Sequence, residues 1–218
     1  MNKRIWYIYG AGGLGRECYD IAYLSLEDVI IEFLEDKPSK DKINGVTVTS
    51  FDNHIPKSWI TVAVGEPDIR EKLLKKIKST SMILKSAISK NSFISSSSTI
   101  EDGTIVAPLC SIQANARLEY NCLINTMSIV GHDCHVKKNS VLSSKVNLGG
   151  SVVVGTSSFV GMGALIKENI LIGDSVIVGM GSVVYRDIQD NVIAIGNPAR
   201  VAKKNDDKQV FNKRNINE

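Results

Sequence analysis

The sequence predicts a small Rossmann-like α/β region at the N-terminus, followed by a parallel β-helix built from six-residue repeats. Three observations support this prediction. The first part of the chain alternates between apolar strands and segments with helical spacing, and a glycine-rich turn follows the first strand. The second part carries an aliphatic residue at every sixth position, and a column of glycines and a column of small residues share that spacing.

The N-terminal region, residues 1–84, alternates between short apolar runs and segments whose apolar residues have helical spacing. This βαβ pattern predicts a small parallel sheet. The expected elements, in order, are a strand at Arg4–Tyr9, a glycine turn at Gly10–Gly15, a helix at Arg16–Leu26, strands at Val29–Leu34 and Ile60–Val64, and a helix at Pro67–Ile77.

The C-terminal region has a strict period of six. From Ile88 to Val184, all 17 residues at this spacing are Ile, Leu or Val. Helices repeat roughly every 3.6 residues and strands every two, so neither produces this period. A hexapeptide period is typical of β-helices, in which a hexad forms a short strand and a corner. Three hexads complete a triangular coil, so the chain is expected to form nearly six coils. An ordinary β-sandwich would show a period of two with irregular turns.

Two further columns keep the same register. A small or β-branched residue, such as Cys110 or Ala164, lies four positions after the aliphatic residue and fits a tight interior. Glycine often lies directly after the aliphatic residue, where we expect a corner whose backbone needs a positive φ. These glycines are Gly131, Gly149, Gly155, Gly161, Gly173 and Gly179.

Composition argues against several classes of protein. The net charge is only +3 and the basic residues are scattered, so no nucleic-acid interface is expected. No apolar run approaches the roughly 20 residues that span a bilayer, and the N-terminus does not resemble a secretory signal. We therefore expect a cytoplasmic protein without membrane insertion, whose cysteines stay reduced. The cysteines are Cys18, Cys110, Cys122 and Cys134.

Five short segments form a combination that is specific, although a single hexad is not. They are Ile8–Gly13 (IYGAGG), Val64–Arg70 (VGEPDIR), Asn125–Cys134 (NTMSIVGHDC), Phe159–Ala164 (FVGMGA) and Gly196–Arg200 (GNPAR). Together they resemble the sialic acid O-acetyltransferase and bacillosamine N-acetyltransferase (NeuD-like) family of hexapeptide-repeat sugar acetyltransferases. The resemblance covers about residues 4–202.

This resemblance implies a left-handed β-helix and a homotrimer with active sites in clefts between subunits. It implies acetyl transfer from acetyl-CoA, as co-substrate, to an amino or hydroxyl group of a nucleotide-activated sugar in the synthesis of bacterial surface glycans. No metal is expected. The implied domains are a nucleotide-sugar-binding domain at 1–84, an acetyltransferase β-helix at 85–202 and a polar tail at 203–218. A sialic acid O-acetyltransferase that acts on the free or CMP-linked sugar is the alternative within the family.

The turn from Gly10 to Gly15 fits the pattern G-x-G-x-x-G, and Asp36 lies 21 residues past Gly15. In this fingerprint, glycines let backbone N–H groups approach phosphate oxygens at a helix N-terminus. Only three strands are expected before the repeats, which is half of a dinucleotide fold, so a nucleoside diphosphate fits better than NAD. The alternative is that the glycines merely form a tight turn. The resemblance places nucleotide-sugar contacts at Gly12, Gly13, Leu14, Glu35, Asp36 and Gly65.

Acetyl transfer needs a general base near neutral pH, a role that suits histidine. His54 lies in the α/β region, where we expect a surface residue. His132 lies two positions after an aliphatic residue, at a corner, so its side chain should point away from the interior. The neighbouring Asp133 can fix the imidazole tautomer and stabilise the imidazolium formed during transfer. The resemblance assigns the base to His132 and the acidic helper to Asp133, with direct transfer to the acceptor.

The remaining contacts carry weaker signals. Family members often have a second histidine nine residues after the base, where it helps to hold the acetyl donor, but that position is Val141 here. His135 does not obviously replace it. The resemblance places coenzyme A contacts at Gly150, Met162 and Met180, each of which is equally compatible with an ordinary repeat corner.

Other functions fit the sequence less well. A covalent route through cysteine is disfavoured, because Cys110, Cys122 and Cys134 belong to the small-residue column and stack as interior packing. A zinc enzyme of the γ-carbonic anhydrase type needs three nitrogen ligands, and the repeats contain two histidines within one hexad. A non-catalytic binding or assembly protein would not need the His132–Asp133 pair. Acyltransferases of lipid A synthesis lack the glycine-rich N-terminal region.

The segment from Ala202 to Glu218 is strongly polar, and we expect a frayed tail there. The sequence leaves three points open: whether the acceptor is an amine or a hydroxyl, which sugar and nucleotide are used, and whether His135 contributes.

Overall fold

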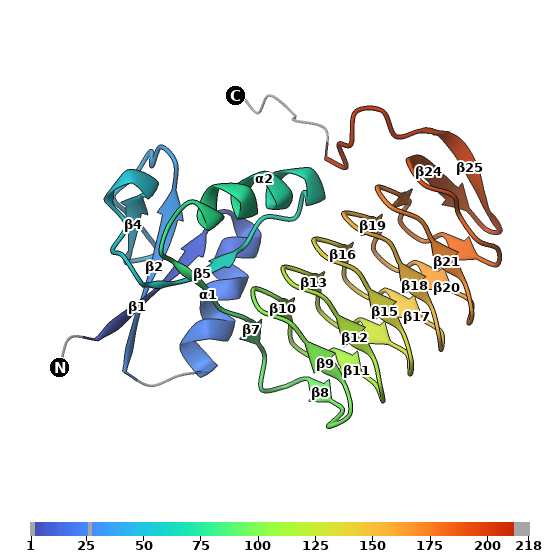
Figure 1. Cartoon of the computed structure of the whole chain (residues 1–218), viewed down its shortest axis with the longest axis horizontal. Helices are drawn as coiled ribbons and strands as arrows, with labels where there is room; N and C mark the ends of the chain where they lie inside the picture. Colours follow the sequence, from blue (N-terminus) through green and yellow to red (C-terminus); the bar gives the residue numbers. More distant parts are fainter. Residues whose placement is uncertain (1–2, 26–27, 212–218) are drawn as a thin grey trace.

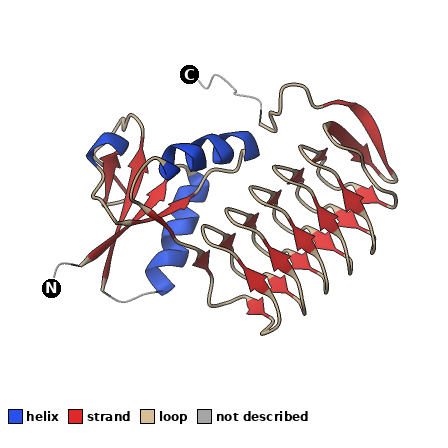
Figure 2. Cartoon of the chain, viewed as in Figure 1, coloured by secondary structure: helices blue, strands red, loops and turns tan. Residues whose placement is uncertain are grey.

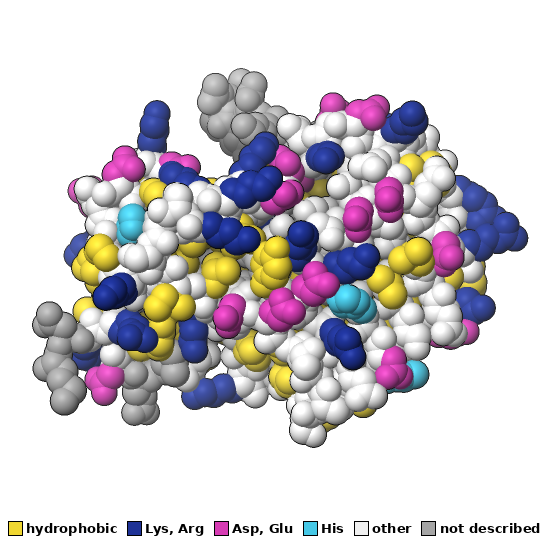
Figure 3. All heavy atoms as spheres, in the orientation of Figure 1, with side chains coloured by type: hydrophobic (Ala, Val, Ile, Leu, Met, Phe, Trp, Pro, Cys, Tyr) yellow, Lys and Arg dark blue, Asp and Glu magenta, His cyan; other side chains and the backbone are white. Residues whose placement is uncertain are grey.

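The computed structural model describes residues 3–25 and 28–211, which form an α/β unit and a β-helix (Figure 1). The α/β unit lies at one end of the β-helix, and the strands of the β-helix stack in successive coils away from it (Figure 2). Acidic and basic side chains are mixed over the face seen in Figure 3. Neither described helix is long and apolar enough to cross a membrane.

The α/β unit is a six-stranded sheet with the order β3-β4-β2-β1-β5-β6, in which only the β3–β4 pair is antiparallel. Helix α1 covers the face that carries Trp6 and Ile8, and α2 covers the opposite face, which carries Tyr7 and Tyr9. The elements are β1 Arg4–Tyr9, α1 Gly13–Ser25, β2 Val29–Glu35, β3 Lys42–Ile43, β4 Val46–Ser50, a 3₁₀ turn Phe51–Asn53, β5 Trp59–Val62, α2 Pro67–Lys78 and β6 Ile83–Leu84.

The structure confirms the predicted order of strands and helices but adds to it. Helix α1 begins at Gly13, three residues earlier than expected, and Leu26 at its predicted end lies outside the described residues. The expectation of three strands was wrong, because β3, β4 and β6 also join the sheet. Two of these strands have only two residues each, too few for an alternating pattern to stand out.

The β-helix confirms the hexad prediction, since each of the 17 aliphatic positions is the second residue of a two-residue strand. Strands 18 residues apart pair in parallel, so three hexads form one coil. The strands are β7 Ala87–Ile88, β8 Phe93–Ile94, β9 Thr99–Ile100, β10 Ile105–Val106, β11 Ser111–Ile112, β12 Arg117–Leu118, β13 Leu123–Ile124, β14 Ile129–Val130, β15 His135–Val136, β16 Val141–Leu142, β17 Asn147–Leu148, β18 Val153–Val154, β19 Phe159–Val160, β20 Leu165–Ile166, β21 Leu171–Ile172, β22 Ile177–Val178 and β23 Val183–Val184.

These strands form three parallel sheets, the faces of a triangular prism. Face 1 contains β7, β10, β13, β16, β19 and β22, face 2 runs from β8 to β23, and face 3 runs from β9 to β21. From Val106 onward the aliphatic column is at most 4% exposed, and the small column between Thr104 and Ala164 is also buried. Each coil therefore covers the apolar interior of the next, as the sequence predicts.

The predicted role of the glycine column was wrong. Positive φ occurs three residues after the aliphatic residue, at every such position from Gly103 to Gly181, and not at the residue directly after it. The glycines directly after the aliphatic residue instead allow close stacking of coils. A Cβ on Gly131 would lie 2.7 Å from the carbonyl oxygen of Leu148, and one on Gly155 would lie 2.3 Å from the backbone of Gly173.

A hairpin closes the far end of the β-helix. Strand β24, Val192–Gly196, extends face 1 and pairs in antiparallel fashion with β25, Ala199–Lys204. The side-chain amide of Asn205, which is buried, donates to the carbonyl oxygen of Ser175 at 2.8 Å. The expected frayed tail was therefore wrong for residues 202–211, and residues 212–218 lie outside the described part of the chain.

A fully buried arginine, Arg70 of α2, joins the two units. Its guanidinium donates to the carbonyl oxygens of Val62 and Val64 at 2.8 and 2.9 Å, at the end of β5. It also donates to the backbone and side-chain oxygens of Asn121 in the β-helix, at 2.7 and 3.0 Å. Burial lowers the pKa of Arg70 to about 10, so the side chain remains charged at neutral pH.

Candidate active site

The corner after β14 positions His132 and Asp133. Strand β14 ends at Val130, and the chain then turns, so the His132 side chain points outward and is 62% exposed. Nδ1 of His132 lies 2.8 Å from Oδ2 of Asp133. The structure thus confirms that His132 occupies an outward-facing corner, and it places the two residues predicted to act together in direct contact.

This contact fixes the tautomer of His132. An ionised carboxylate only accepts hydrogen bonds, so the neutral imidazole must carry its proton on Nδ1. Nε2 then bears the free lone pair, and no hydrogen-bond partner contacts it within residues 3–25 and 28–211. A solvent-accessible Nε2 lone pair, with its tautomer held by a carboxylate, is the arrangement that a general base requires.

Asp133 is itself held in place. Its backbone has a φ of 59°, and its N–H donates to the carbonyl oxygen of Ala114 at 2.9 Å. The Asn115 side chain donates to Oδ1 of Asp133 at 3.0 Å. Hydrogen bonds from His132 and then Asn115 lower the pKa of Asp133 below its usual value, so the carboxylate is ionised at neutral pH. Sequence reasoning missed Asn115, although it lies 18 residues, one coil, before Asp133.

Gly150 lies next to the imidazole ring, one coil further along. A Cβ on Gly150 would lie 2.5 Å from both Cε1 and Nε2 of His132. The backbone N–H of Ser151 donates to the carbonyl oxygen of His132 at 2.8 Å, which fixes the two coils relative to each other. Glycine is therefore required at position 150 for the ring to take this orientation.

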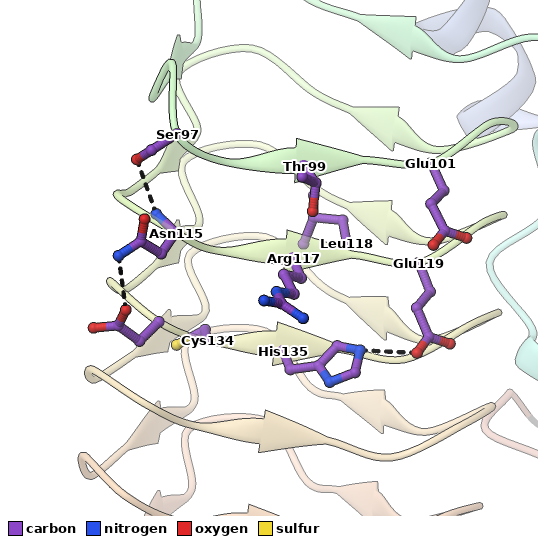
Figure 4. Close-up of a pocket in the computed structure, with 10 residues that line it drawn as sticks. Ser97, Thr99, Glu101, Asn115, Arg117, Leu118, Glu119, Cys134 and His135 are labelled. Carbon is purple, nitrogen blue, oxygen red and sulfur yellow. Dashed lines mark hydrogen bonds and ion pairs between the residues drawn. The ribbon is translucent and has the colours of Figure 1, made fainter.

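A polar groove of about 870 Å³ runs along the outer surface of face 3 (Figure 4). Asp133 is one of the residues that line it. Arg117 and His135 point into it from neighbouring strands. Nε2 of His135 lies 2.8 Å from Oε1 of Glu119, whose second oxygen accepts the backbone N–H of Lys138 at 2.9 Å. His135 is thus a half-buried partner of Glu119, one face away from the outward position of His132.

Met162 and Met180 lie together but on another edge of the prism. They follow β19 and β22 of face 1, whereas His132 and Gly150 follow β14 and β17 of face 2. The two methionines are 51% and 78% exposed. Within this chain, the structure brings Gly150 to His132 but does not bring the methionines to the same corner.

The glycines of the turn in the α/β unit have two different environments. Gly10 has a φ of 109°, and a Cβ on Gly15 would lie 1.9 Å from the Gly10 carbonyl oxygen, so these two glycines allow the tight turn and close packing. Gly12 and Gly13 are exposed, and a Cβ on either would have no atom within 4 Å. Gly12 directly precedes α1, and Gly13 and the half-buried Leu14 begin its first turn, whose N–H groups favour an anion.

The other predicted nucleotide contacts lie at the ends of neighbouring strands. Glu35 ends β2, and its carboxylate lies 3.3 Å from the backbone nitrogen of Ala11. Asp36 follows, pairs with Lys76 at 2.5 Å and accepts a hydrogen bond from Tyr9. The hydrogen bonds from Lys76 and Tyr9 lower the pKa of Asp36.

Gly65 completes this set at the end of β5. Strands β1 and β5 are neighbours, and Ala63 donates its N–H to the carbonyl oxygen of Tyr9 at 2.9 Å. The chain adds β2 and β4 on one side of β1 and then crosses back to add β5 on the other side. The strand order therefore reverses between β1 and β5. Ligands of open α/β sheets bind at the carboxyl ends of strands at such a switch point. The turns around Gly12 and Gly65 both lie there.

His54 and the four cysteines, the remaining candidates for a chemical role, are half-buried or buried. His54 is half-buried, and its Nδ1 lies 2.6 Å from the carbonyl oxygen of Phe51. All four cysteines are buried and unpaired. Burial raises the pKa of Cys18 and Cys122 to about 12, and it also raises that of Cys110 and Cys134, so their thiols are protonated at neutral pH. In the described ranges, no three His, Cys, Asp or Glu side chains cluster as a metal site would need.

Comparison with known proteins identifies similar sequences and structures for both the α/β unit and the β-helix. Residues 6–77 match the family model of the PglD N-terminal domain. The acetyltransferase domain of PglB from Neisseria gonorrhoeae is 29% identical, with a TM-score of 0.86 over 91% of this chain and 99% of that chain. A perosamine N-acetyltransferase from Caulobacter crescentus, solved with CoA and GDP-perosamine, is 28% identical, with a TM-score of 0.84 over 91% and 96%.

WeeI from Acinetobacter baumannii is similar as well, at 26% identity and a TM-score of 0.83 over 91% of this chain and 99% of that chain. These matches extend through both units. They confirm the predicted fold, a Rossmann-like unit followed by a left-handed β-helix.

Proposed function

We propose that this chain, which belongs to the PglD- and NeuD-like family of sugar acetyltransferases, transfers an acetyl group from acetyl-CoA to an amino or hydroxyl group of a nucleotide-activated sugar. Solved relatives bind CoA and, in one case, a GDP-linked amino sugar. The observation that carries the assignment is the free Nε2 of His132, because its tautomer is fixed by Asp133 and its ring lies at an open corner.

In the proposed reaction, Nε2 of His132 removes a proton from the acceptor as the acceptor nitrogen or oxygen attacks the thioester carbonyl carbon. The carbon–sulfur bond then breaks, and the CoA sulfur leaves and takes up the proton from the imidazolium. Asp133 stabilises the imidazolium while it exists, because the carboxylate is charged and accepts the Nδ1 proton. A backbone N–H of the coil stabilises the oxyanion.

The α/β unit would hold the nucleotide part of the acceptor. Gly12, Gly13 and Leu14 present backbone N–H groups at the positive end of α1, which suits a diphosphate. Glu35 at the end of β2, Asp36 directly after it and Gly65 after β5 lie at neighbouring strand ends, where they can select the remaining groups. This assignment agrees with the switch point between β1 and β5.

The assembly that we propose is a homotrimer with active sites between subunits. Two features support it: Met162 and Met180 lie on a different edge of the prism from His132, and the groove on face 3 is open at the surface. A neighbouring copy could present its methionine edge to the His132 corner and complete the coenzyme A site. The residue ranges of the domains, 1–84, 85–202 and 203–218, remain predictions.

We also propose that the reaction takes place in the cytoplasm during the synthesis of surface glycans. Four unpaired, buried cysteines are in keeping with a reducing compartment.

The test is acetyl-CoA turnover by the purified full chain against a panel of acceptors. The panel contains UDP- and GDP-linked amino sugars, free sialic acid and CMP-sialic acid, and release of the CoA thiol is measured. We expect turnover with at least one nucleotide-linked amino sugar. Turnover only with free or CMP-linked sialic acid would favour the O-acetyltransferase alternative. Absence of turnover with every acceptor, with the trimer intact, would contradict the proposed function.

A further inference from the structure

The C-terminal segment returns from the far end of the β-helix to the α/β unit. After β25 the chain runs back toward α2 (Figure 1), and Phe211 reaches the loop after β5. A Cβ on Gly65 would lie 3.5 Å from the Phe211 ring, which is van der Waals contact. The same ring packs edge-on against Phe159 of β19, with centroids 5.6 Å apart. Phe211 therefore lies between the two units, against a loop assigned to nucleotide-sugar binding.

A buried carboxylate anchors this segment. Glu66 is 7% exposed and precedes α2. Its carboxylate accepts the backbone N–H groups of Val210, at 2.9 and 3.1 Å, and of Phe211, at 3.1 Å. A buried carboxyl group is costly to leave without hydrogen-bond partners, so the position of the segment is specific. Because the donors are backbone groups, the anchor fixes the path of the chain without using the phenylalanine ring.

The two apolar residues of the segment differ in burial. Val210 packs against the hydrophobic core and secures the chain there. Phe211 remains 55% exposed. An aromatic ring that is held rigidly at its backbone, but leaves half of its surface to solvent, has a face free to contact a ligand. Aromatic faces stack on nucleobases and on apolar faces of sugars irrespective of sequence or hydrogen-bonding pattern.

The location of the ring agrees with this role. Gly65 lies at the switch point beside the exposed Gly12 and Gly13, where the diphosphate is assigned. A nucleoside or sugar joined to that diphosphate must extend along a neighbouring surface. Phe211 lies beside Gly65 on one side and packs against Phe159 of the β-helix on the other, so it lies on the boundary between the α/β unit and the β-helix.

We propose that Phe211, positioned by Glu66, forms an apolar wall of the nucleotide-sugar site and contributes to its affinity and specificity. The inference rests on the proposed function, since it assumes that the turns around Gly12 and Gly65 bind the nucleotide-sugar. The C-terminal segment would thus be part of the acceptor site and not a polar tail.

The test compares Phe211→Ala with Phe93→Ala in the full chain. Phe93, on β8, is a matched control because it is also an exposed phenylalanine, at 63%, and lies in the first coil. We expect Phe211→Ala to raise the KM for the nucleotide-sugar by about ten-fold, the usual cost of losing one stacking partner, with the KM for acetyl-CoA within two-fold of wild type. Phe211→Tyr should restore the wild-type KM, and Phe93→Ala should change neither value.

A second variant tests whether Glu66 acts by positioning the Phe211 ring. Glu66→Ala releases the segment while keeping the ring, so it should raise the KM for the nucleotide-sugar as Phe211→Ala does. The double variant should show no further rise, because both changes remove the same contact. An unchanged or lower KM in Phe211→Ala, or an equal rise in both KM values, would overturn the proposal.

Failure of the proposed function is distinguishable from failure of the Phe211 proposal, because the wild-type chain would then show no turnover. In that case, calorimetric binding of UDP and GDP to wild type and Phe211→Ala replaces the KM values. Equal affinity for both nucleotides in the two proteins would overturn the inference.

Discussion

The α/β unit and the β-helix position their functional residues in different ways. In the β-helix, Asn115, Asp133 and Ser151 lie at the same corner of successive coils, 18 residues apart, because the backbone repeats. In the α/β unit, the strand ends are held by individual side chains, such as Tyr9 and Lys76 around Asp36. In the β-helix, the sequence position of a residue therefore determines which corner or face it occupies. In the α/β unit, the position of a residue depends on individual tertiary contacts that do not repeat along the sequence.

The same contrast separates two uses of glycine. Glycines directly after the aliphatic residues, such as Gly131 and Gly155, face the backbone of the next coil at distances that no Cβ tolerates. Gly12 and Gly13 face open space. Gly131 and Gly155 are thus required for the close stacking of coils, while Gly12 and Gly13 leave open space beside the backbone. Gly150 is a third case, because its neighbour is the His132 imidazole, the proposed general base.

The largest expected effect concerns His132, the proposed base at the β-helix corner. His132→Gln should lower kcat by about 10²- to 10⁴-fold, since a positioned general base contributes on this order. His135→Gln and His54→Gln serve as matched controls, because the His135 ring is paired with Glu119 one face away from the His132 ring, and the His54 ring lies against the carbonyl oxygen of Phe51 in the α/β unit. Each should retain kcat within a few-fold of wild type. Steady-state kinetics of the three variants checks this, and an equal loss in all three would contradict a specific role of His132.

The next effect concerns the link between the two units. Arg70→Met should lower the free energy of unfolding by about 3 kcal/mol, because several buried carbonyl oxygens lose their donor. Arg186→Met, at an exposed position, is the matched control and should change stability little. Denaturant unfolding measures both. If Arg70→Met unfolds at the wild-type midpoint, the two units are not joined through this side chain.

A smaller effect tests the fit between coils. Gly150→Ala should lower kcat by roughly 10- to 100-fold, since the added methyl group displaces the His132 ring from its present orientation. Gly103→Ala is the control: its φ is 75°, so it should cost stability without a comparable loss of kcat. Measuring kcat and the melting temperature for both variants distinguishes the two outcomes. Wild-type kcat in Gly150→Ala would show that the ring position is not critical.

The smallest effect concerns the acidic helper. Asp133→Asn should lower kcat by about ten-fold, less than loss of the base, because an exposed pair is screened by solvent. The pKa of Asp133 is lowered in the folded state, so its contribution to stability is present at neutral pH and is lost as the pH falls through that lowered pKa. The melting temperatures of variant and wild type should therefore converge as the pH falls below that lowered pKa. A difference that grows with acidification would contradict the assigned direction.

The sequence predicts the β-helix more fully than the α/β unit. The aliphatic and small-residue columns predict all 17 strands, and the outward corner at His132 follows from the same count. The positive φ three residues after the aliphatic residue was missed, although Asn115, Asn121 and Asp133 are residue types that tolerate it. The glycines directly after the aliphatic residue mark close stacking of coils instead, and the sequence alone does not show which coil each of them faces.

In the α/β unit, sequence patterns identify only the longer elements. Strands β3 and β6 have two residues each, so only their pairing with longer neighbours defines them. The prediction for the C-terminal segment was wrong for a related reason. Its composition is polar, and the hydrogen bonds of the Asn205 side chain and of the Val210 and Phe211 N–H groups span 30 to 145 residues of sequence. Long-range contacts of single side chains leave no local pattern to detect.

The central claim is that the α/β unit binds the nucleotide-sugar while the β-helix supplies the base. The most direct test is calorimetric titration of UDP and GDP into Gly12→Asp and His132→Gln, side by side with wild type. Position 12 can accept a side chain without a clash, so Gly12→Asp should fold normally but repel a diphosphate. We predict loss of nucleotide affinity in Gly12→Asp and wild-type affinity in His132→Gln. Wild-type affinity in Gly12→Asp, or its loss in His132→Gln, would contradict the claim.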